Sequence, residues 1–212
     1  MAVSPVIAGF GVGAALASTP GPVQAVLLTE SVRGGIARGF RALAGASTVF
    51  ASLLVCLALG LSLVVPRGAA LAALQVAGGA LLLWLSADAF RQLRNSAVAG
   101  APAPGRFDVP PYARGALAVV LNPGGWLFLA AVASPLFASA GQHAGPAGAL
   151  AVAATMTAGV AAGDAVTVLV GGMVLRRARS RAGWWLRCAL AALLAGFGVW
   201  LLVTGVMSLV NR

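Results

Sequence analysis

Residues 115–163 form a run of 49 positions without a single aspartate, glutamate, lysine or arginine. As one straight helix the run would measure about 70 Å at 1.5 Å per residue. The hydrocarbon core of a bilayer is only about 30 Å thick. The run must therefore fold back on itself, and the segments Gly141-Gln142-His143 and Gly145-Pro146 supply typical turn residues. This run alone predicts two membrane-spanning helices.

Four further charge-free runs have lengths suited to crossing a membrane, which takes about 20 residues. They cover residues 1–29, 42–66, 68–87 and 188–211. We therefore expect an all-α integral membrane protein with six transmembrane helices. The predicted spans lie near residues 4–28, 42–65, 68–87, 115–138, 147–175 and 184–209.

The composition points the same way. Hydrophobic residues make up 60% of the chain and charged residues only 8%, against about 25% charged in an ordinary soluble domain. All fourteen basic residues are arginine, and four acids leave a net charge of +10. A soluble globular enzyme could not solvate its surface with so few charges, so the main solvent for this surface is expected to be lipid.

The arginines are unevenly divided between the two sides of the predicted bundle. Twelve follow the first, third and fifth spans, whereas only Arg67 and Arg212 fall on the opposite side. The positive-inside rule then places both termini outside the cytoplasm. Because short clusters of this kind mark topology, whereas nucleic-acid binders carry basic grooves interleaved with aromatic residues, no nucleic-acid partner is expected.

Residues 95–113, rich in alanine, proline and glycine, predict a flexible cytoplasmic linker. It would join two halves of three spans each, residues 1–94 and 114–212. A repeat with an odd number of spans must be inverted in the membrane, so two inverted three-helix repeats are expected. The oligomeric state stays open, a homo-oligomer included.

Prolines interrupt the first span of each half, at Thr19-Pro20-Gly21-Pro22 and at Asn122-Pro123-Gly124-Gly125. Proline removes an N–H and clashes with the carbonyl four residues back, which should free the carbonyls of Leu16, Ser18 and Val119. A half-helix beginning near Val23 would offer N–H groups to an anion, while free carbonyls accept from an ammonium.

The paired breaks therefore predict a site for a small zwitterion, as in transporters with discontinuous helices. A plain proline kink is the alternative interpretation of each motif. The candidate substrate-binding residues are Thr19, Pro20, Gly21, Pro22, Gln24, Asn122, Pro123 and Gly124.

Asp164 lies near the middle of the fifth span, where a carboxylate costs about 2.5–3.5 kcal/mol on insertion scales. Such residues often relay protons, so Asp164 is the candidate for proton coupling; the alternative is a structural, permanently protonated group. Glu30 and Asp88 sit at span ends near arginines, where local ion pairs are expected. The sequence predicts no metal site, no cofactor and no catalytic residues, because it has one histidine and no paired carboxylates.

Four short motifs stand in order along the chain: Thr19-Pro20-Gly21-Pro22 followed by Leu27-Leu28 and Arg33-Gly34-Gly35, residues 77–85, Leu121-Asn122-Pro123, and residues 196–202. Together they resemble the lysine exporter (LysE/RhtB-type) family of amino-acid exporters. The resemblance implies a multi-pass permease of the bacterial cytoplasmic (inner) membrane that exports amino acids or related small metabolites, energised by the proton gradient, and is not an enzyme.

The chain departs from the family pattern where polar residues are common. Val23 follows Pro-Gly-Pro, the second span has Ser47, Thr48 and Phe50 but no acid, and Gly124 stands where a lysine is frequent. These departures put a strongly cationic substrate in doubt.

Three alternative functions remain at this stage. A thiol–disulfide electron carrier would need Cys56 and Cys188 to be close together and redox-active. Metal-ion efflux is disfavoured by the lack of intramembrane histidine and carboxylate clusters. A membrane scaffold without transport activity is the third alternative.

Overall fold

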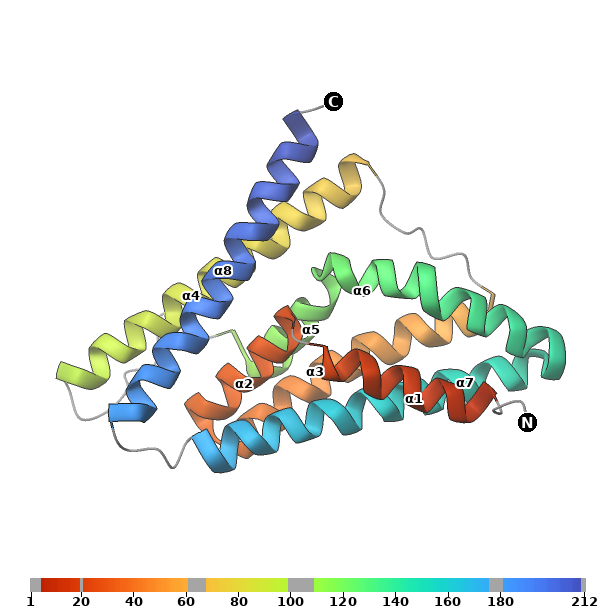
Figure 1. Ribbon diagram of the computed structural model, residues 1–212, viewed down its shortest axis with the longest axis horizontal. Helices are drawn as coiled ribbons and strands as arrows, with labels where there is room; N and C mark the ends of the chain where they lie inside the picture. Colours follow the sequence, from red (N-terminus) through yellow and green to blue (C-terminus); the bar gives the residue numbers. More distant parts are fainter. Residues whose placement is uncertain (1–4, 20, 61–67, 99–108, 176–180, 211–212) are drawn as a thin grey trace.

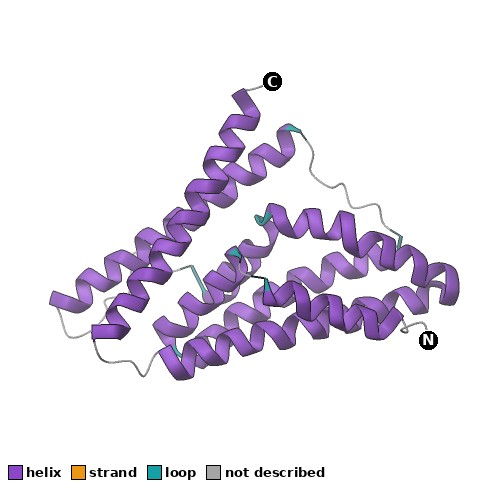
Figure 2. Ribbon diagram, viewed as in Figure 1, coloured by secondary structure: helices purple, strands orange, loops and turns teal. Residues whose placement is uncertain are grey.

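The computed structural model describes residues 5–19, 21–60, 68–98, 109–175 and 181–210, and every regular element in these ranges is a helix (Figure 2). The expected all-α fold is therefore confirmed for the described part of the chain. In chain order the elements are α1 (Pro5–Ser18), α2 (Pro22–Gly34), α3 (Ile36–Ala58), α4 (Ala69–Val98), α5 (Pro111–Val120), α6 (Pro123–Phe128), the π-helix η1 (Leu129–Ala133), α7 (Ser134–Leu169), the π-helix η2 (Val170–Leu175) and α8 (Arg181–Val210).

Within the described ranges, four stretches are long and apolar enough to cross a membrane: Ile36–Ala58, Ala69–Arg91, Pro123–Met173 and Cys188–Val210. A fifth candidate is the pair α1 and α2, which are bent by 67° across a short break. These stretches describe a multi-pass membrane protein. The count of six spans remains a prediction.

The stretch Pro123–Met173 contains the turn that the sequence predicted. Ala144 (φ −134°) and Gly145 (φ 62°) leave the helical conformation inside α7, and Pro146 follows. The positive φ explains the glycine, because residues with a Cβ rarely adopt it. Figure 1 shows the chain reversing direction beyond α6 and returning along α7.

Several helices run beyond their predicted bounds: α2 continues past residue 28 to Gly34, and α3 starts at Ile36 rather than at residue 42. The helix predicted to end at residue 87 continues as α4 to Val98, because residues 88–98 include several good helix formers such as alanine, leucine, glutamine and arginine. It therefore takes up the start of the predicted linker 95–113, whose residues 99–108 lie outside the described ranges.

Three helix pairs form the most extensive contacts: α4 with α8, α1 with α7, and α3 with α5. Glycines permit the approach, as expected in membranes. A methyl group at Gly13 would overlap the Met156 carbonyl of α7, and one at Gly115 would overlap the Ala42 carbonyl of α3. In Figure 1 the α4–α8 pair extends away from the bundle that contains α1, α3, α6 and α7.

Candidate functional site

The first predicted helix is broken where the sequence indicated. α1 ends at Ser18, Gly21 is extended (φ −165°, ψ −178°), and α2 starts at Pro22. Proline suits this first helical position because its missing N–H would have no helical partner there. Pro20 lies outside the described residues.

The second break separates α5 from α6. Asn122 is extended (φ −89°, ψ 102°), and its Oδ1 accepts a hydrogen bond from the Gly124 N–H at 3.1 Å. Proline again takes the first helical position, as Pro123. The two proline motifs therefore interrupt their helices in the same way.

Two of the three carbonyls expected to be free, those of Leu16 and Val119, have backbone partners. The Leu16 carbonyl accepts the Thr19 N–H at 3.1 Å, and the Val119 carbonyl accepts the Asn122 N–H at 3.2 Å. Both predictions were wrong because the last turn of each helix tightens and uses these groups. Side chains reach other carbonyls instead: Gln24 Nε2 donates to Ala17 at 3.3 Å, and Trp126 Nε1 donates to Val120 at 2.8 Å.

Both breaks open onto one cavity of about 230 Å³. Of the residues predicted to bind substrate, Pro123 is buried beside the cavity without lining it, and Pro20 is not described. The other six line it together with Asp164: Thr19, Gly21, Pro22, Gln24, Asn122 and Gly124. The remaining lining is Gly125 and an apolar wall of Leu16, Ala17, Val23, Ala46, Phe50, Val119 and Val160.

Among the described residues that line the cavity, Asp164 is the only ionisable one. Its side chain comes from α7 and the residue is 2% exposed. Gln24, at the start of α2, donates its Nε2 to Asp164 Oδ1 at 3.3 Å. The candidate acid and the candidate amide, which stand 140 positions apart in the sequence, therefore meet at one wall of the cavity.

The family model of the LysE type translocator matches residues 14–205. The chain belongs to the LysE type translocator family. Searches of curated proteins and of solved structures each returned no match to it. The resemblance found in the motifs is thereby confirmed, and family membership makes this multi-pass membrane protein a transport protein.

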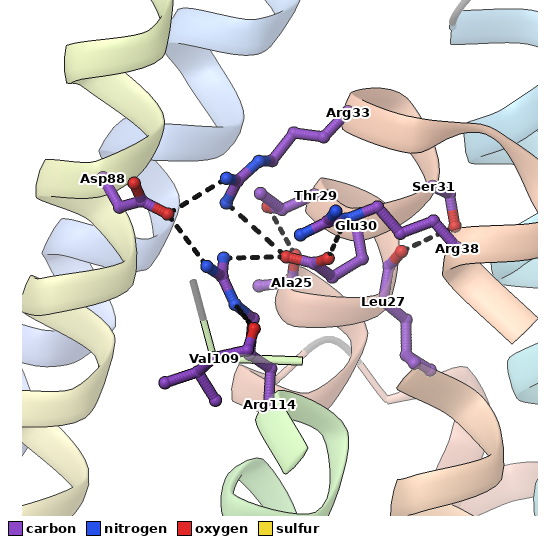
Figure 3. A network of polar contacts seen from close by, with 10 residues as sticks. All are labelled: Ala25, Leu27, Thr29, Glu30, Ser31, Arg33, Arg38, Asp88, Val109 and Arg114. Carbon is purple, nitrogen blue, oxygen red and sulfur yellow. Dashed lines mark hydrogen bonds and ion pairs between the residues drawn. The ribbon is translucent and has the colours of Figure 1, made fainter. Parts of the chain in front are cut away.

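This translocator carries a buried ion cluster that the sequence predicted only in part (Figure 3). Glu30 forms the expected local pair, with Arg38 Nε at 2.6 Å, whereas Asp88 of α4 pairs with an arginine of another helix, Arg33 of α2, whose Nη2 lies 3.0 Å away. Arg114 was not foreseen. Its guanidinium joins both acids, at 3.0 Å to Glu30 Oε1 and 3.1 Å to Asp88 Oδ2.

Arg114 is enclosed by polar and aromatic partners. It directly precedes the charge-free run 115–163, and the sequence pattern predicts only a topological role for it. Its side chain is 1% exposed. Its Nε donates to the Val109 carbonyl at 2.9 Å, and its guanidinium carbon lies 5.3 Å from the centre of the Trp84 ring. The signal available in the sequence is an arginine directly before an apolar span, and this signal does not identify the partners of the arginine.

The ion cluster joins four helices on the arginine-rich side. Glu30 and Arg33 lie near the end of α2, Arg38 near the start of α3, Asp88 on α4 and Arg114 on α5. The cavity lies at the opposite ends of α2 and α5. The gap around Glu30 and Arg114 has no room for a water molecule. The ion cluster is therefore packed without a water-filled gap between Glu30 and Arg114.

The described residues contain no group of three or more histidine, cysteine or acidic side chains that could hold a metal ion. Cys56 and Cys188 are both free thiols and half-buried.

Proposed function

We propose that this translocator exports amino acids or related small zwitterionic metabolites across the bacterial cytoplasmic membrane by proton antiport. The observation that carries the proposal is the single cavity at which the two broken helices meet, with Asp164 in its wall. Family membership supports transport as such. The substrate class and the coupling ion are our inference from the cavity.

The cavity offers complementary groups to the two ends of a zwitterion. The Ala17 carbonyl and the Asp164 carboxyl are acceptors for an ammonium group. The start of α2 supplies N–H groups that have no acceptor within the helix, together with the positive end of a helix dipole, and both favour a carboxylate. The hydroxyl of Thr19 and the amide of Asn122 add neutral polar groups at the same two breaks.

Asp164 is the proposed proton carrier. Its neutral form avoids the cost of a buried charge, whereas its ionised form can bind a cation. Alternating exposure of the cavity to the two sides of the membrane would then let the carboxyl release its proton on one side and reload on the other.

The helix pairing supports the proposed inverted repeat. α1, the first part of the first predicted span, packs on α7, which includes the fifth span. α5, the first part of the fourth span, packs on α3, which is the second span. When the first three-span half is exchanged with the second, the α1–α7 pairing becomes the α5–α3 pairing. The α4–α8 pairing is unchanged by the same exchange. The proposed orientation keeps both termini outside the cytoplasm and the ion cluster on the cytoplasmic side.

Purified protein in liposomes with an imposed pH gradient tests the proposal. We expect efflux of a preloaded amino-acid mixture in the wild type and its loss in Asp164→Asn, with the fold retained. His143→Gln is the matched control, since His143 is an exposed titratable residue outside the cavity. Unchanged gradient-driven transport by Asp164→Asn would remove the coupling role.

A further inference from the structure

Gln24 holds a position inside the cavity that a ligand could take. Its amide nitrogen lies 3.3 Å from the Ala17 carbonyl oxygen and 3.3 Å from Asp164 Oδ1. These acceptors come from two elements, the end of α1 and the middle of α7. An amide NH₂ has two protons to donate and an ammonium has three, so the same acceptors suit either group.

We propose that the Gln24 carboxamide is a place-holder for the ammonium group of the substrate. On binding, the ammonium displaces it and donates to Asp164 and to the Ala17 carbonyl. The exchange is favourable because a hydrogen bond between two charged groups is about twice as strong as one between neutral groups. This inference rests on the proposed function, for it concerns the same cavity.

The rest of the cavity wall limits the substrate further. Within the part of the chain that the structure describes, seven apolar residues line it and no basic residue does. A second charge on the substrate side chain would be desolvated there without a partner, at considerable cost. The volume of about 230 Å³ lies below the roughly 300–1,000 Å³ typical of sites for drug-sized ligands. The inferred substrate is therefore a single amino acid with one ammonium and an apolar side chain.

A shared carboxyl also explains the coupling. Asp164 cannot carry a proton and bind an ammonium as a carboxylate at the same time, so proton and substrate exclude each other at one group. No other ionisable residue in the described ranges lines the cavity. Four described charged residues lie on the elements packed against α7, and none of them lines the cavity. Three belong to the ion cluster and the fourth is exposed: Glu30, Arg33, Arg38 and Arg41.

Calorimetric binding to the full-length protein in lipid nanodiscs tests the place-holder role, with leucine as the probe. We expect leucine to bind, and N-acetylleucine, which lacks the ammonium, and lysine, which adds a charge, to bind at least about tenfold more weakly. In Gln24→Met the internal competitor is gone, so leucine should bind about 2- to 10-fold more tightly, the value of one net hydrogen bond. In Gln24→Lys a tethered ammonium takes the site and leucine binding should be lost.

Gln75→Met, on α4 and outside the cavity, is the matched control and should bind leucine as the wild type does. If Gln24→Met weakens binding as much as Gln24→Lys, then Gln24 is a direct ligand and the place-holder role is overturned, while the proposed function stands. Equal binding of leucine and N-acetylleucine would also overturn it. If the wild type neither binds nor exports any amino acid, the proposed function and this inference fail together.

Discussion

The guanidinium of Arg114 lies 3.0 Å from the carboxylate of Glu30, although the two residues are 84 positions apart and each side chain is only 1% exposed. The pair joins α5 to α2, and both helices lead to the cavity at their other ends. A buried ion pair adds little stability compared with an apolar pair, but the loss of one partner leaves the other buried charge with fewer compensating contacts. This asymmetry makes the ion cluster accessible to experiment.

Arg114→Met should destabilise the protein by about 1.5–3 kcal/mol, the value of a hydrogen bond to a charged group, because Arg38 and Arg33 still pair with the two acids. The double variant Arg114→Met/Glu30→Gln should lose less than the sum of the single variants, since both changes remove the same Arg114–Glu30 contact. Unfolding in detergent measures both. Arg41→Met, at an exposed position on α3, is the control, and strict additivity of the cluster variants would contradict the pairing.

The same cluster should act as the barrier on the arginine-rich side of the cavity. In a Cys56→Ala/Cys188→Ala background, the cavity-lining variant Ala46→Cys reports access to a membrane-impermeant thiol reagent. We expect Glu30→Gln/Arg114→Met to speed labelling from the arginine-rich side by about tenfold, because the open state of such an equilibrium is otherwise a minor population. Labelling rates that do not change would place the barrier elsewhere.

Gly115→Ala should loosen the contact between α5 and α3. The added methyl group would overlap the Ala42 carbonyl, and overpacking of this kind costs about 1–3 kcal/mol. Gly196→Ala is the matched control, because a Cβ there meets nothing within 4 Å. The thermal unfolding of the two variants should differ clearly, and equal stability would show that the α3–α5 contact can relax.

Asn122→Ala should weaken the start of α6, because it removes the acceptor for the Gly124 N–H. The loss of a capping side chain costs about 0.5–2 kcal/mol. Asn122→Ser keeps an acceptor at this position and should restore most of the stability. Thermal unfolding measures both variants, and a serine variant as unstable as the alanine variant would contradict the capping role.

Much of the fold could be predicted from local chemistry. The charge-free runs predict apolar helices, Gly145-Pro146 predicts the turn, and the two proline motifs predict the breaks. Each depends on a few neighbouring residues. The same reasoning was wrong about the carbonyls of Leu16 and Val119, because the flexible last turn of a helix can tighten to use them. Six of the candidate substrate-binding residues line the cavity, but the sequence did not identify the residues that they contact.

The helices and their interruptions at the prolines and the turn can be predicted from the sequence alone. Helix formation and its interruption depend on a few neighbouring residues. The contacts of Gln24 with Asp164 and of Arg114 with Glu30 depend on the tertiary structure. Such pairs come from segments 84 to 140 residues apart. Whether they meet depends on the packing of whole helices, through contacts such as that of Gly115 with α3, and no local pattern contains that information.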